Sequence, residues 1–453
     1  MIAIALLVAG ATVGVPTDLS AATAVSADPV HVGAQAAAPV SESGEWTLGA
    51  CTRAALDASP RLAEASAQTR AAWSATKAAR AERWPHLILR GGYEYVSETM
   101  QMPLGDLVPG LSAIELGTHH AYDLRLGAEV ALYTGGALSG HIAAQEATAR
   151  AHHHEQCADT LLVLHEVRSG FFEALAAEAQ VQAAQVAERR LDRHIQELGR
   201  RIAAGASSEE ARIQAVARLR KAQIRHAEAR AATRAAQLEL GRRIGRPGAE
   251  IHPVGPLETS LLSPEFSAET TMARAPERPE LHALAERVAQ SQARTDVAQA
   301  AYLPKIVAQA AVHEGRPGVD PIADDWMSFA TAGVMLEWPL WEWGARSGRV
   351  EQARAAEREA QARYDELRDR LVQAQALARV RWETAHEQAR MAQERRDLER
   401  NRLDLVKGRY ANGAATESER LDAEDDLAEA ESAWTAALAR VRLAEVELLH
   451  FLE

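Results

Sequence analysis

The stretch AYLPKIVAQAAVHEG, residues 301–315, leaves an alanine-rich helical pattern at Pro304 and then alternates between apolar and polar positions. One side of the alternation holds Ile306, Ala308, Ala310 and Val312, and the other holds Lys305, Gln309 and His313. An interior proline does not continue a helix, and a period of two indicates a β-strand. A single short strand between helices has no neighbour to pair with, so its partners must come from elsewhere in the chain or from other chains.

The sequence around this proline occurs twice. Pro60 and Pro85 recur as Pro279 and Pro304 at one constant spacing. At a second constant spacing, the recurring segments are LYTGGALSGHI (132–142) with LWEWGARSGRV (340–350), and RIAAGASSE (201–209) with RYANGAATE (409–417). Two constant spacings indicate two rigid blocks in each copy, so the chain is an internal duplication.

Each copy contains a long helical pattern that ends at a glycine. Residues 137–204 and 345–412 contain no proline, and each predicts helix on the order of 100 Å long at 1.5 Å per residue. Gly205 and Gly413 follow, and a second helical pattern of about 40 residues begins after each of them. A glycine followed by small or polar residues suits a tight turn between helices, so each copy predicts an antiparallel helical hairpin with its tip at that glycine.

Two alternating segments precede each hairpin, and we predict strands at about 86–96, 121–133, 305–315 and 328–340. Each segment has one apolar face and one more polar face. The more polar faces hold Arg90, Glu94, Asp123, Arg125, Glu129, Gln309 and Glu337. The apolar faces carry the aromatic residues Tyr93, Tyr95, Tyr122 and Trp338.

The predicted helices offer mostly alanine and charge, and therefore no matching surface for four apolar strand faces. If these faces contact lipid, the charged residues opposite need water, as in a barrel with a wet lumen. Four strands cannot close a barrel, and an open sheet edge is not tolerated in a bilayer. The barrel interpretation therefore requires other copies of the chain, and three copies would supply twelve strands.

Composition agrees with long helices that pack through small residues, because 47% of the residues are hydrophobic and only 5% are aromatic. The net charge of -13 argues against nucleic acid as a partner, since phosphate neutralisation needs a basic face.

An apolar run near the start, followed by Val25-Ser26-Ala27, predicts a secretory signal peptide at 1–27. The expected divisions after it are a first repeat (28–246), a linker or equatorial segment rich in proline (247–276) and a second repeat (277–453).

Cysteine and histidine give weak indications of chemistry. Leu48-Gly49-Ala50-Cys51 superficially matches a lipoprotein cleavage box, but polar residues precede it, which favours a small residue in a first helical turn. The sequence leaves open whether Cys51 is lipidated and whether it pairs with Cys157. His152-His153-His154 and His165 suggest metal, yet adjacent helical histidines point about 100° apart, so we expect no metal site and no cofactor. No P-loop, GxSxG or HExxH motif is present, and we expect no enzymatic activity.

The ordered and duplicated set of segments resembles the TolC-like outer-membrane efflux channel family over about 46–453. The segments that carry the resemblance are WTLGACTRAALDASPRLAEA, AERWPHLILRGGY, AAYLPKIVAQAAV, LYTGGALSGHIAAQEATARA, LEWPLWEWGARSGRVEQARAA, RIAAGASSEEARIQA and RYANGAATESERLDAEDDLAEAESAWTAAL. The resemblance implies a mainly α fold with a membrane β-barrel part. In that fold, the duplicated unit trimerises into a 12-stranded barrel in the outer-membrane lipid and a helical tunnel in the periplasm.

The resemblance also implies partners and sites. It implies a homotrimer that passively conducts exported substrates for an inner-membrane pump and a periplasmic adaptor, as in tripartite efflux or type I secretion. The hairpin-tip residues expected to contact the adaptor are Gly205, Ala206, Ser207, Gly413, Ala414 and Ala415. A periplasmic gate is implied at Glu419, Asp422 and Tyr410, although Ala211 stands where the family has an acidic partner for the tyrosine. The alternative for the two acidic residues is an ordinary solvated helix face.

The second function considered is a periplasmic adaptor of the same kind of system, also exported and also built around a helical hairpin. An adaptor would show one hairpin flanked by β-rich domains, whereas this sequence has two hairpins, each preceded by a strand pair. These residues identify neither the exported substrate, whether drug, metal ion or protein, nor the pump.

Overall fold

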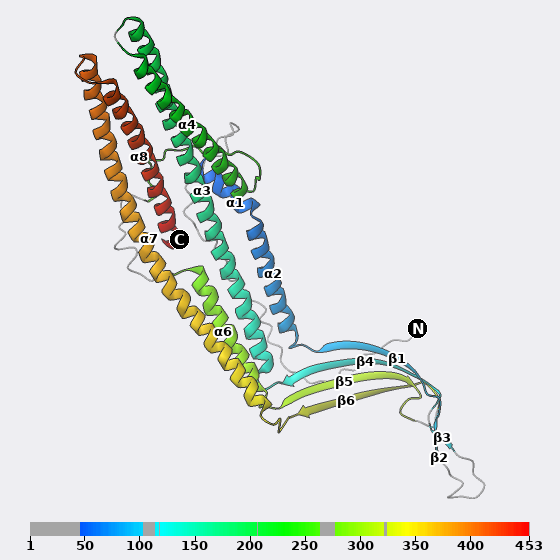
Figure 1. Cartoon of the computed structure of the whole chain (residues 1–453). Coiled ribbons are helices and arrows are strands. Elements are labelled where there is room, and N and C mark those ends of the chain that lie inside the picture. Colours follow the sequence, from blue (N-terminus) through cyan, green and yellow to red (C-terminus); the bar gives the residue numbers. More distant parts are fainter. Residues whose placement is uncertain are drawn as a thin grey trace, which may run out of the picture. The chain divides into compact units, whose positions relative to one another are not determined.

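The computed structural model describes residues 46–102, 114–116, 118–205, 207–262, 277–320 and 324–452. The predicted signal peptide, the tip residue Ala206 and the second half of the linker, 263–276, lie outside the described residues. The described chain is mostly helical with a small antiparallel sheet, and the predicted fold class is confirmed as a duplicated unit of a strand pair and a long helical hairpin (Figure 1).

The two copies contain corresponding elements. The first consists of α1 (Leu48–Ala58), α2 (Pro60–Ala81), β1 (His86–Tyr95), β4 (His120–Tyr133), α3 (Ala137–Ala203) and α4 (Glu209–Arg243). The second consists of α6 (Pro279–Ala300), β5 (Lys305–Arg316), β6 (Met327–Glu337), α7 (Ala345–Ala411) and α8 (Glu417–Leu452). The two long helices, α3 and α7, both contain 67 residues.

The structure differs from the sequence analysis at one strand boundary and adds detail in two other places. The helical part before β1 divides at Ser59, because Pro60 suits the first turn of a new helix and α2 begins there. The last strand ends at Glu337 and not at 340, and Pro339, which has no N–H to donate to a ladder, lies two residues later. The loop of the first copy contains a short two-stranded sheet of β2 (Met100–Met102) and β3 (Ile114–Leu116).

The main sheet has the strand order β1-β4-β5-β6, and all its pairs are antiparallel. β5, the strand that follows Pro304, therefore pairs with β6 of its own copy and with β4 of the other copy. This β4–β5 pairing joins the two repeats within one chain. β1 and β6 each pair on one side only, so both are edge strands in a single chain.

Short turns with left-handed glycines connect the sheet to the long helices. Gly135 and Gly136 have φ of 63° and 94°, and Gly344 of the second copy has φ of 86°. A Cβ on Gly135 would lie 2.6 Å from the Cβ of Leu303, so the close approach of the two chain segments also requires glycine there. The second copy has Trp343 at the position of Gly135, with φ of 50° and a side chain that is 90% exposed.

The helices pack closely because their contact surfaces consist largely of alanine and glycine. α3 contacts α2, α4, α6 and α8, while α7 contacts α6 and α8. At the α3–α6 contact, a Cβ added to Gly140 would lie 2.9 Å from Val297, which leaves no room for a larger residue. The α3–α6 and α3–α8 contacts also join the two copies along the helical part.

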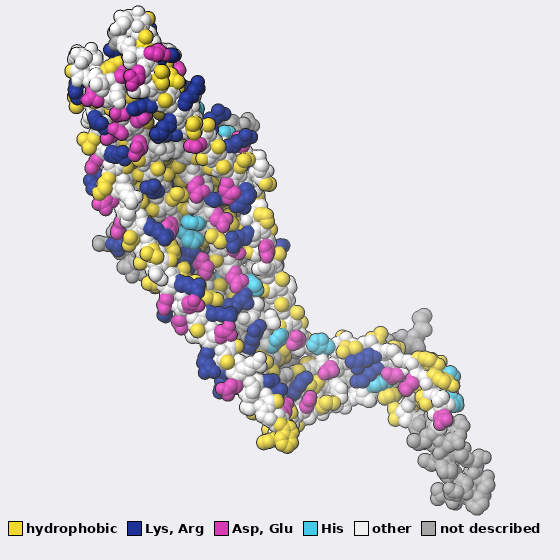
Figure 2. Space-filling model, viewed as in Figure 1, with side chains coloured by type: hydrophobic (Ala, Val, Ile, Leu, Met, Phe, Trp, Pro, Cys, Tyr) yellow, Lys and Arg dark blue, Asp and Glu magenta, His cyan; other side chains and the backbone are white. Residues whose placement is uncertain are grey.

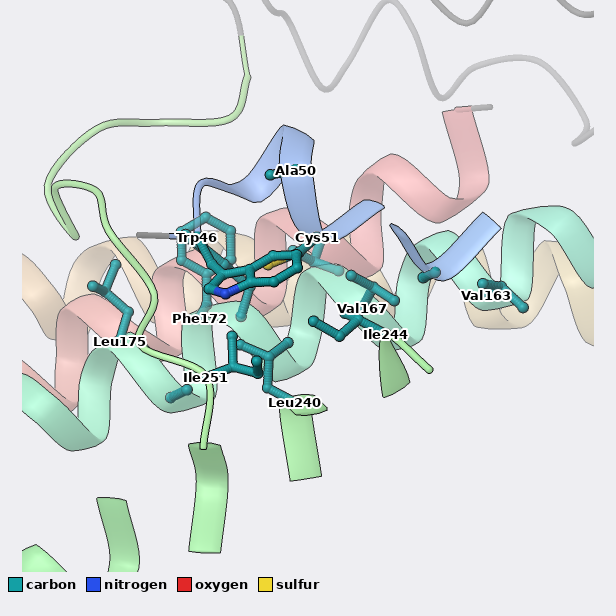
Figure 3. Packing of buried hydrophobic residues seen from close by; sticks show 14 of the residues in the cluster. Trp46, Ala50, Cys51, Val163, Val167, Phe172, Leu175, Leu240, Ile244 and Ile251 are labelled. Atoms are coloured by element: carbon teal, nitrogen blue, oxygen red, sulfur yellow. The ribbon is translucent and has the colours of Figure 1, made fainter. Parts of the chain in front are cut away.

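The largest hydrophobic core surrounds the middle of α3. Trp46, Cys51, Phe171, Phe172 and Leu240 all contribute side chains to it, together with Ile244 and Ile251 of the segment after α4 (Figure 3). Phe171 and Phe172 point about 100° apart on the helix, yet both are buried, so other segments cover α3 on more than one face. Trp46 also forms an isolated bridge with Pro253, and its ring lies beneath the Arg246 guanidinium. This core fixes the first part of the linker against both hairpins.

Candidate functional site

The strand register brings the seven polar residues predicted from the sequence to one face of the sheet. Paired residues of an antiparallel ladder point to the same face, and successive residues point to opposite faces. The pairs that define this face are Arg90 with Arg125, His86 with Glu129, Glu129 with Gln309, and Lys305 with Glu337. Glu94 and Asp123 fall on the same face by alternation. Like charges in direct opposition, as at Arg90 and Arg125, need water around them, so this face is built for an aqueous environment.

The opposite face of the sheet is apolar and uncovered. Leu89, Leu126, Val312 and Val334 are between 53% and 67% exposed. Soluble proteins seldom leave so many large aliphatic side chains contiguous and in contact with water. The described part of the chain provides no element that covers this face, because the contacts of the sheet strands are with one another.

Aromatic side chains gather at both ends of the apolar face. At the end distant from the helices, Tyr122 lies 5.1 Å from Tyr93 and 5.8 Å from Trp326, measured between ring centroids. At the helical end, the Trp338 indole N–H donates to the Tyr302 carbonyl at 3.2 Å, and Trp341 packs edge-on against Trp343. Hydrophobic side chains are visible at this second end, where β6 leads into α7, whereas charged side chains of both signs alternate along the helices (Figure 2).

The polar residues that interrupt the apolar face lie at its far end. Glu314 follows Val312 on this face and is in close contact with the Ser328 hydroxyl of β6. Arg316 makes a two-pronged pair with Asp324 at 2.9 and 2.8 Å. Glu314 lies opposite Leu124 and Arg316 opposite Tyr122, so the apolar face of β4 continues from Tyr122 to Leu132, whereas that of β5 ends at Val312.

The two hairpin tips have the same backbone turn. Gly205 and Gly413 have φ of 69° and 71°, and each amide donates to a carbonyl three residues earlier, Ile202 at 2.9 Å and Tyr410 at 3.1 Å. A Cβ at either glycine would contact nothing within 4 Å, so the glycines are there for backbone conformation. Gly205, Gly413 and Ala414 are exposed, and Ser207 and Ala415 are half-buried.

Tyr410 lies in a buried cluster that joins the second hairpin to the first. The Glu417 carboxylate acts on its hydroxyl electrostatically, and Glu417 is in close ion-pair contact with His194 of α3. Burial and the Glu417 carboxylate raise the pKa of Tyr410 to about 12, so the hydroxyl keeps its proton. The Arg201 and Arg420 guanidinium groups lie 4.5 and 5.2 Å from the Tyr410 ring centroid. The acidic partner that the sequence lacks at Ala211 is thus supplied by Glu417.

The two predicted gate carboxylates are both engaged within the chain. Glu419 accepts hydrogen bonds from the Thr416 amide at 2.7 Å and from the Thr416 hydroxyl at 3.3 Å. The Thr416 hydroxyl in turn accepts from the Glu419 amide at 3.2 Å, which completes a capping box at the start of α8. The bond from the Thr416 amide holds the pKa of Glu419 below its ordinary value. Asp422 pairs with Arg218 of α4 at 2.7 Å, a second link between the hairpins.

The sequence analysis missed His194, Glu417 and Arg218. A signal for His194 was available, because it occurs at helical spacing between Leu191 and Leu198, which both pack in a buried cluster with Leu421. A histidine within such an apolar stripe is a buried polar group that needs a partner. Glu417 and Arg218 gave no such signal, since acidic and basic residues are common on exposed helix faces.

The histidine run and the cysteines have structural environments of their own. His152 pairs with Glu155 at 2.8 Å, and the His154 ring lies 5.4 Å from that of His282. Among the described residues, no three side chains of His, Cys, Asp or Glu are grouped as metal ligands.

Both cysteines are free, and burial of Cys51 raises the pKa of its thiol to about 12. Lipidation of Cys51 would require cleavage before it, which would remove Trp46 from the core and Thr47, the N-cap of α1.

None of the helices in the described ranges is both long and apolar enough to cross a bilayer.

Comparisons with known proteins agree with this architecture. Residues 52–246 and 274–452 match the family described as outer membrane efflux protein. A search of curated proteins found no significant match. Among solved structures, VceC of Vibrio cholerae is 19% identical with a TM-score of 0.76, and the alignment covers 89% of this chain and 95% of VceC.

Two further solved structures are similar to the same extent. CusC is 18% identical with a TM-score of 0.77, and the alignment covers 89% of this chain and 91% of CusC. The CmeC outer membrane channel of Campylobacter jejuni is 16% identical with a TM-score of 0.77, with 89% of this chain and 85% of CmeC covered. At these identities the likeness shows the fold. The family match spans both repeats and gives no support to the adaptor alternative, and the chain belongs to the outer membrane efflux protein family.

Proposed function

We propose that three copies of this chain form a channel through the outer membrane, which passively conducts substrates delivered in the periplasm. The observation that carries the proposal is the sheet, which has one polar face, one uncovered apolar face and two unpaired edges. A bilayer covers the apolar face, and water in the lumen solvates the polar face. The three four-stranded sheets together make the 12-stranded barrel.

The edges explain why several chains are needed. An unpaired edge strand presents N–H and C=O groups that have no partner in hydrocarbon, and each unsatisfied group costs several kcal/mol. Pairing β6 of one chain with β1 of the next satisfies both edges, and repetition around a threefold axis closes the sheet. The polar residues of β1, β4, β5 and β6 then line the lumen.

On β4, the apolar face is about as long as a bilayer core is thick. From Tyr122 to Leu132 the strand is about 33 Å long at about 3.3 Å per residue, or roughly 25 Å across the membrane for a strand tilted about 40°. The aromatic groups at Tyr93 and Tyr122, and at Trp338 and Trp341, fall at the two ends of this face. Aromatic girdles occupy the same positions at the lipid–water interfaces of outer-membrane barrels.

A second uncovered surface supports assembly in the helical part. Leu377, Met391, Leu398 and Leu405 of α7 follow a seven-residue period and are between 46% and 72% exposed. An apolar stripe with this period is typical of a helix that packs against another helix. We assign it to the neighbouring copy in the trimer, whose helices together with these form the tunnel.

The tips are the proposed contact with a periplasmic adaptor, which would link the channel to an inner-membrane pump. Gly205, Gly413 and Ala414 are exposed, and residues with no side chain or only a methyl group let a partner helix approach closely. Near them, the proposed gate consists of Tyr410, Glu419 and Asp422, whose contacts hold the tips in place.

The double substitution Glu419→Gln with Asp422→Asn should raise single-channel conductance in planar bilayers, and an unchanged conductance would exclude these residues from the gate.

The channel itself is tested by purification in detergent and reconstitution. We expect native mass spectrometry to give the mass of three chains, and planar bilayers to show discrete conductance steps. A monomer that stays soluble without detergent, or a trimer that does not conduct in any condition, contradicts the proposal.

A further inference from the structure

The start of the second copy and the end of α8 meet at a buried arginine. Arg278 is the N-cap of α6 and is only 2% exposed. Its backbone carbonyl accepts the first amides of α6, from Leu281 at 3.0 Å and from His282 at 3.2 Å. Its guanidinium reaches the last turn of α8, where Nη2 lies 2.9 Å from Nε2 of His450. The side chain therefore links the first helix of this copy to its last helix.

This hydrogen bond assigns a protonation state to His450. A guanidinium has only donors, so Nε2 of His450 must be the acceptor and carries no proton. Protonation would place one N–H against another and a second positive charge beside an almost fully buried cation. Arg278 is also held by two hydrogen bonds to Glu280, at 3.1 and 2.7 Å, and its Cζ lies 5.7 Å from the Phe451 ring centroid. Arg278 is thus fixed on α6, and a charged imidazole would be displaced from it.

The surroundings of His450 oppose a positive charge on its ring. Burial and the Arg278 cation lower the pKa of His450 to about 4, and the His165 ring, 4.8 Å away between centroids, adds to the effect. Burial also lowers the pKa of His165. Burial alone would raise the pKa of Glu280, but the hydrogen bonds from Arg278 outweigh it and lower this pKa. Near pH 7, both histidines are therefore neutral beside a charged Arg278–Glu280 pair.

The remaining charged groups of this cluster come from three helices. Glu166 lies 3.7 Å from Arg61, and Glu447 lies 2.5 Å from Arg381 of α7. The two histidines are the only imidazoles among these groups, and imidazole is the side chain that ordinarily changes charge between pH 5 and 8. The titratable and charged side chains that face the two rings are Glu166 and Arg168 of α3, Arg278 and Glu280 of α6, and Glu447 of α8.

We propose that Arg278 and the neutral imidazole of His450 form an acid-labile link that closes the second copy, and that protonation of His450 releases the last turn of α8 from the start of α6. The corresponding positions of the first copy carry no group that titrates in this range. Ser59 stands where the second copy has Arg278, and Arg242, which pairs with Glu239 of its own helix at 2.7 Å, stands where it has His450. The link belongs to the folded chain and does not depend on the proposed channel.

The direction of the pH effect follows from the two states of the imidazole. When the link is open, His450 takes up a proton with the ordinary imidazole pKa of about 6.5, and when the link is closed its pKa is about 4. The closed link binds fewer protons than the open one. It is therefore fully stable above about pH 6.5 and weakens progressively as the pH falls toward about 4. These two values predict that the ratio of open to closed link rises roughly twentyfold between pH 7 and pH 5.

Hydrogen exchange of the intact protein measures this ratio. The full-length chain in detergent is exchanged at pH 7 and at pH 5, and the amide rates at the end of α8 are corrected for the intrinsic effect of pH. We expect the protection of this end to fall by roughly twentyfold, and that of the corresponding end of α4 to change far less. Unchanged protection at the end of α8 overturns the proposal. An equal loss at both ends overturns it as well, because it would mean a general softening in acid.

Substitutions of the two histidines decide whether the link is responsible. His450→Gln retains an acceptor for Arg278, because the side-chain carbonyl of glutamine takes the place of Nε2, but it does not titrate. We expect this variant to be protected like the wild type at pH 7 and to lose nothing further at pH 5. His165→Gln is the matched control, because it removes the other imidazole and leaves the hydrogen bond from Arg278, so it should still respond to pH. A full response in His450→Gln, or its loss in His165→Gln, overturns the proposal.

Arg278→Met tests the link from its other side. Methionine fills part of the same space without a donor, so the end of α8 should exchange faster already at pH 7, and the difference between the two pH values should shrink. Wild-type protection and a wild-type pH response in this variant would show that Arg278 does not hold α8. If the variant does not fold, His450→Gln and His165→Gln give the answer. Exchange is read without conductance, so a chain that fails to conduct in bilayers leaves the link standing, and loss of the link leaves the channel proposal standing.

Discussion

The apolar face of the sheet and the seam between α7 and α8 are both lined by large aliphatic side chains, but only the seam is complete in a single chain. Leu403 of α7 is 2% exposed and packs with Ala423 and Leu427 of α8, whereas Val334 of β6 is 67% exposed. The same contrast occurs within α7, where Leu398 lies on the other side of the helix and is 68% exposed. Burial within the chain thus identifies surfaces that stabilise the fold, and exposure identifies surfaces that lipid or other copies cover in the proposed channel.

The largest expected effect comes from Leu403. Leu403→Ala should cost about 2–5 kcal/mol of the free energy of unfolding, because it opens a cavity in a seam that is already buried within the single chain. Leu398→Ala should leave the stability of the single chain nearly unchanged and weaken only the assembly. Chemical denaturation of the detergent-solubilised protein, followed by circular dichroism and by the mass of the complex, distinguishes the two. Equal loss of chain stability in both variants would contradict the assignment of Leu398 to a contact between chains.

The sheet face is tested by neighbouring substitutions on opposite faces. Val334→Arg should cost about 2–4 kcal/mol of stability in lipid, because it places a charge on the apolar face, which the proposed barrel turns toward hydrocarbon. Gly333→Arg should be tolerated, since that position lies on the polar face, which the proposed barrel turns toward its lumen, and a Cβ added there contacts nothing within 4 Å. Urea unfolding in liposomes gives both values. Similar penalties for the two variants would show that lipid does not cover the apolar face.

At the tips, removal of the Tyr410 hydroxyl should have an intermediate effect. Tyr410→Phe removes the hydroxyl on which the Glu417 carboxylate acts, and a polar interaction with a charged group contributes about 1.5–3 kcal/mol. We expect higher single-channel conductance and faster amide hydrogen exchange at the start of α8. Tyr364→Phe, on the same helix but distant from the tip, is the control. If both variants behave like the wild type, Tyr410 does not restrain the tip.

The smallest effects should distinguish the caps of the two hairpins. Thr416→Ala removes both hydrogen bonds that pair its hydroxyl with Glu419, and it should cost roughly 0.5–2 kcal/mol. Ser208→Ala removes one bond, in which the hydroxyl accepts from the Ala211 amide at 3.2 Å, and should cost less. Hydrogen exchange in the first turns of α4 and α8 measures both. A larger effect at Ser208 would mean that the reciprocal cap at Thr416 adds no stability.

Periodicity was sufficient to predict the elements and their faces. The seven residues from Arg90 to Glu337 were assigned to one face by counting alternate positions, and the register agrees, because the period of a strand is two regardless of its partners. The tips were located from Gly205 and Gly413, since a left-handed turn favours glycine. The partners of Glu419 and Asp422 could not be predicted. Asp422 pairs with Arg218, about two hundred positions away in the sequence, and nothing local distinguishes that arginine from its neighbours.

The sequence by itself determined the duplication, the long hairpins and the division of each strand into a polar and an apolar face, because these depend on local spacing and on breaks at proline and glycine. Tertiary structure alone decided that β5 pairs with β4 of the other copy, that Cys51 is enclosed in the core, and that His194 reaches Glu417. These features depend on which residues meet across large sequence separations. Contacts of this kind depend on how whole helices and strands pack, and the spacing of residues within one segment does not predict them.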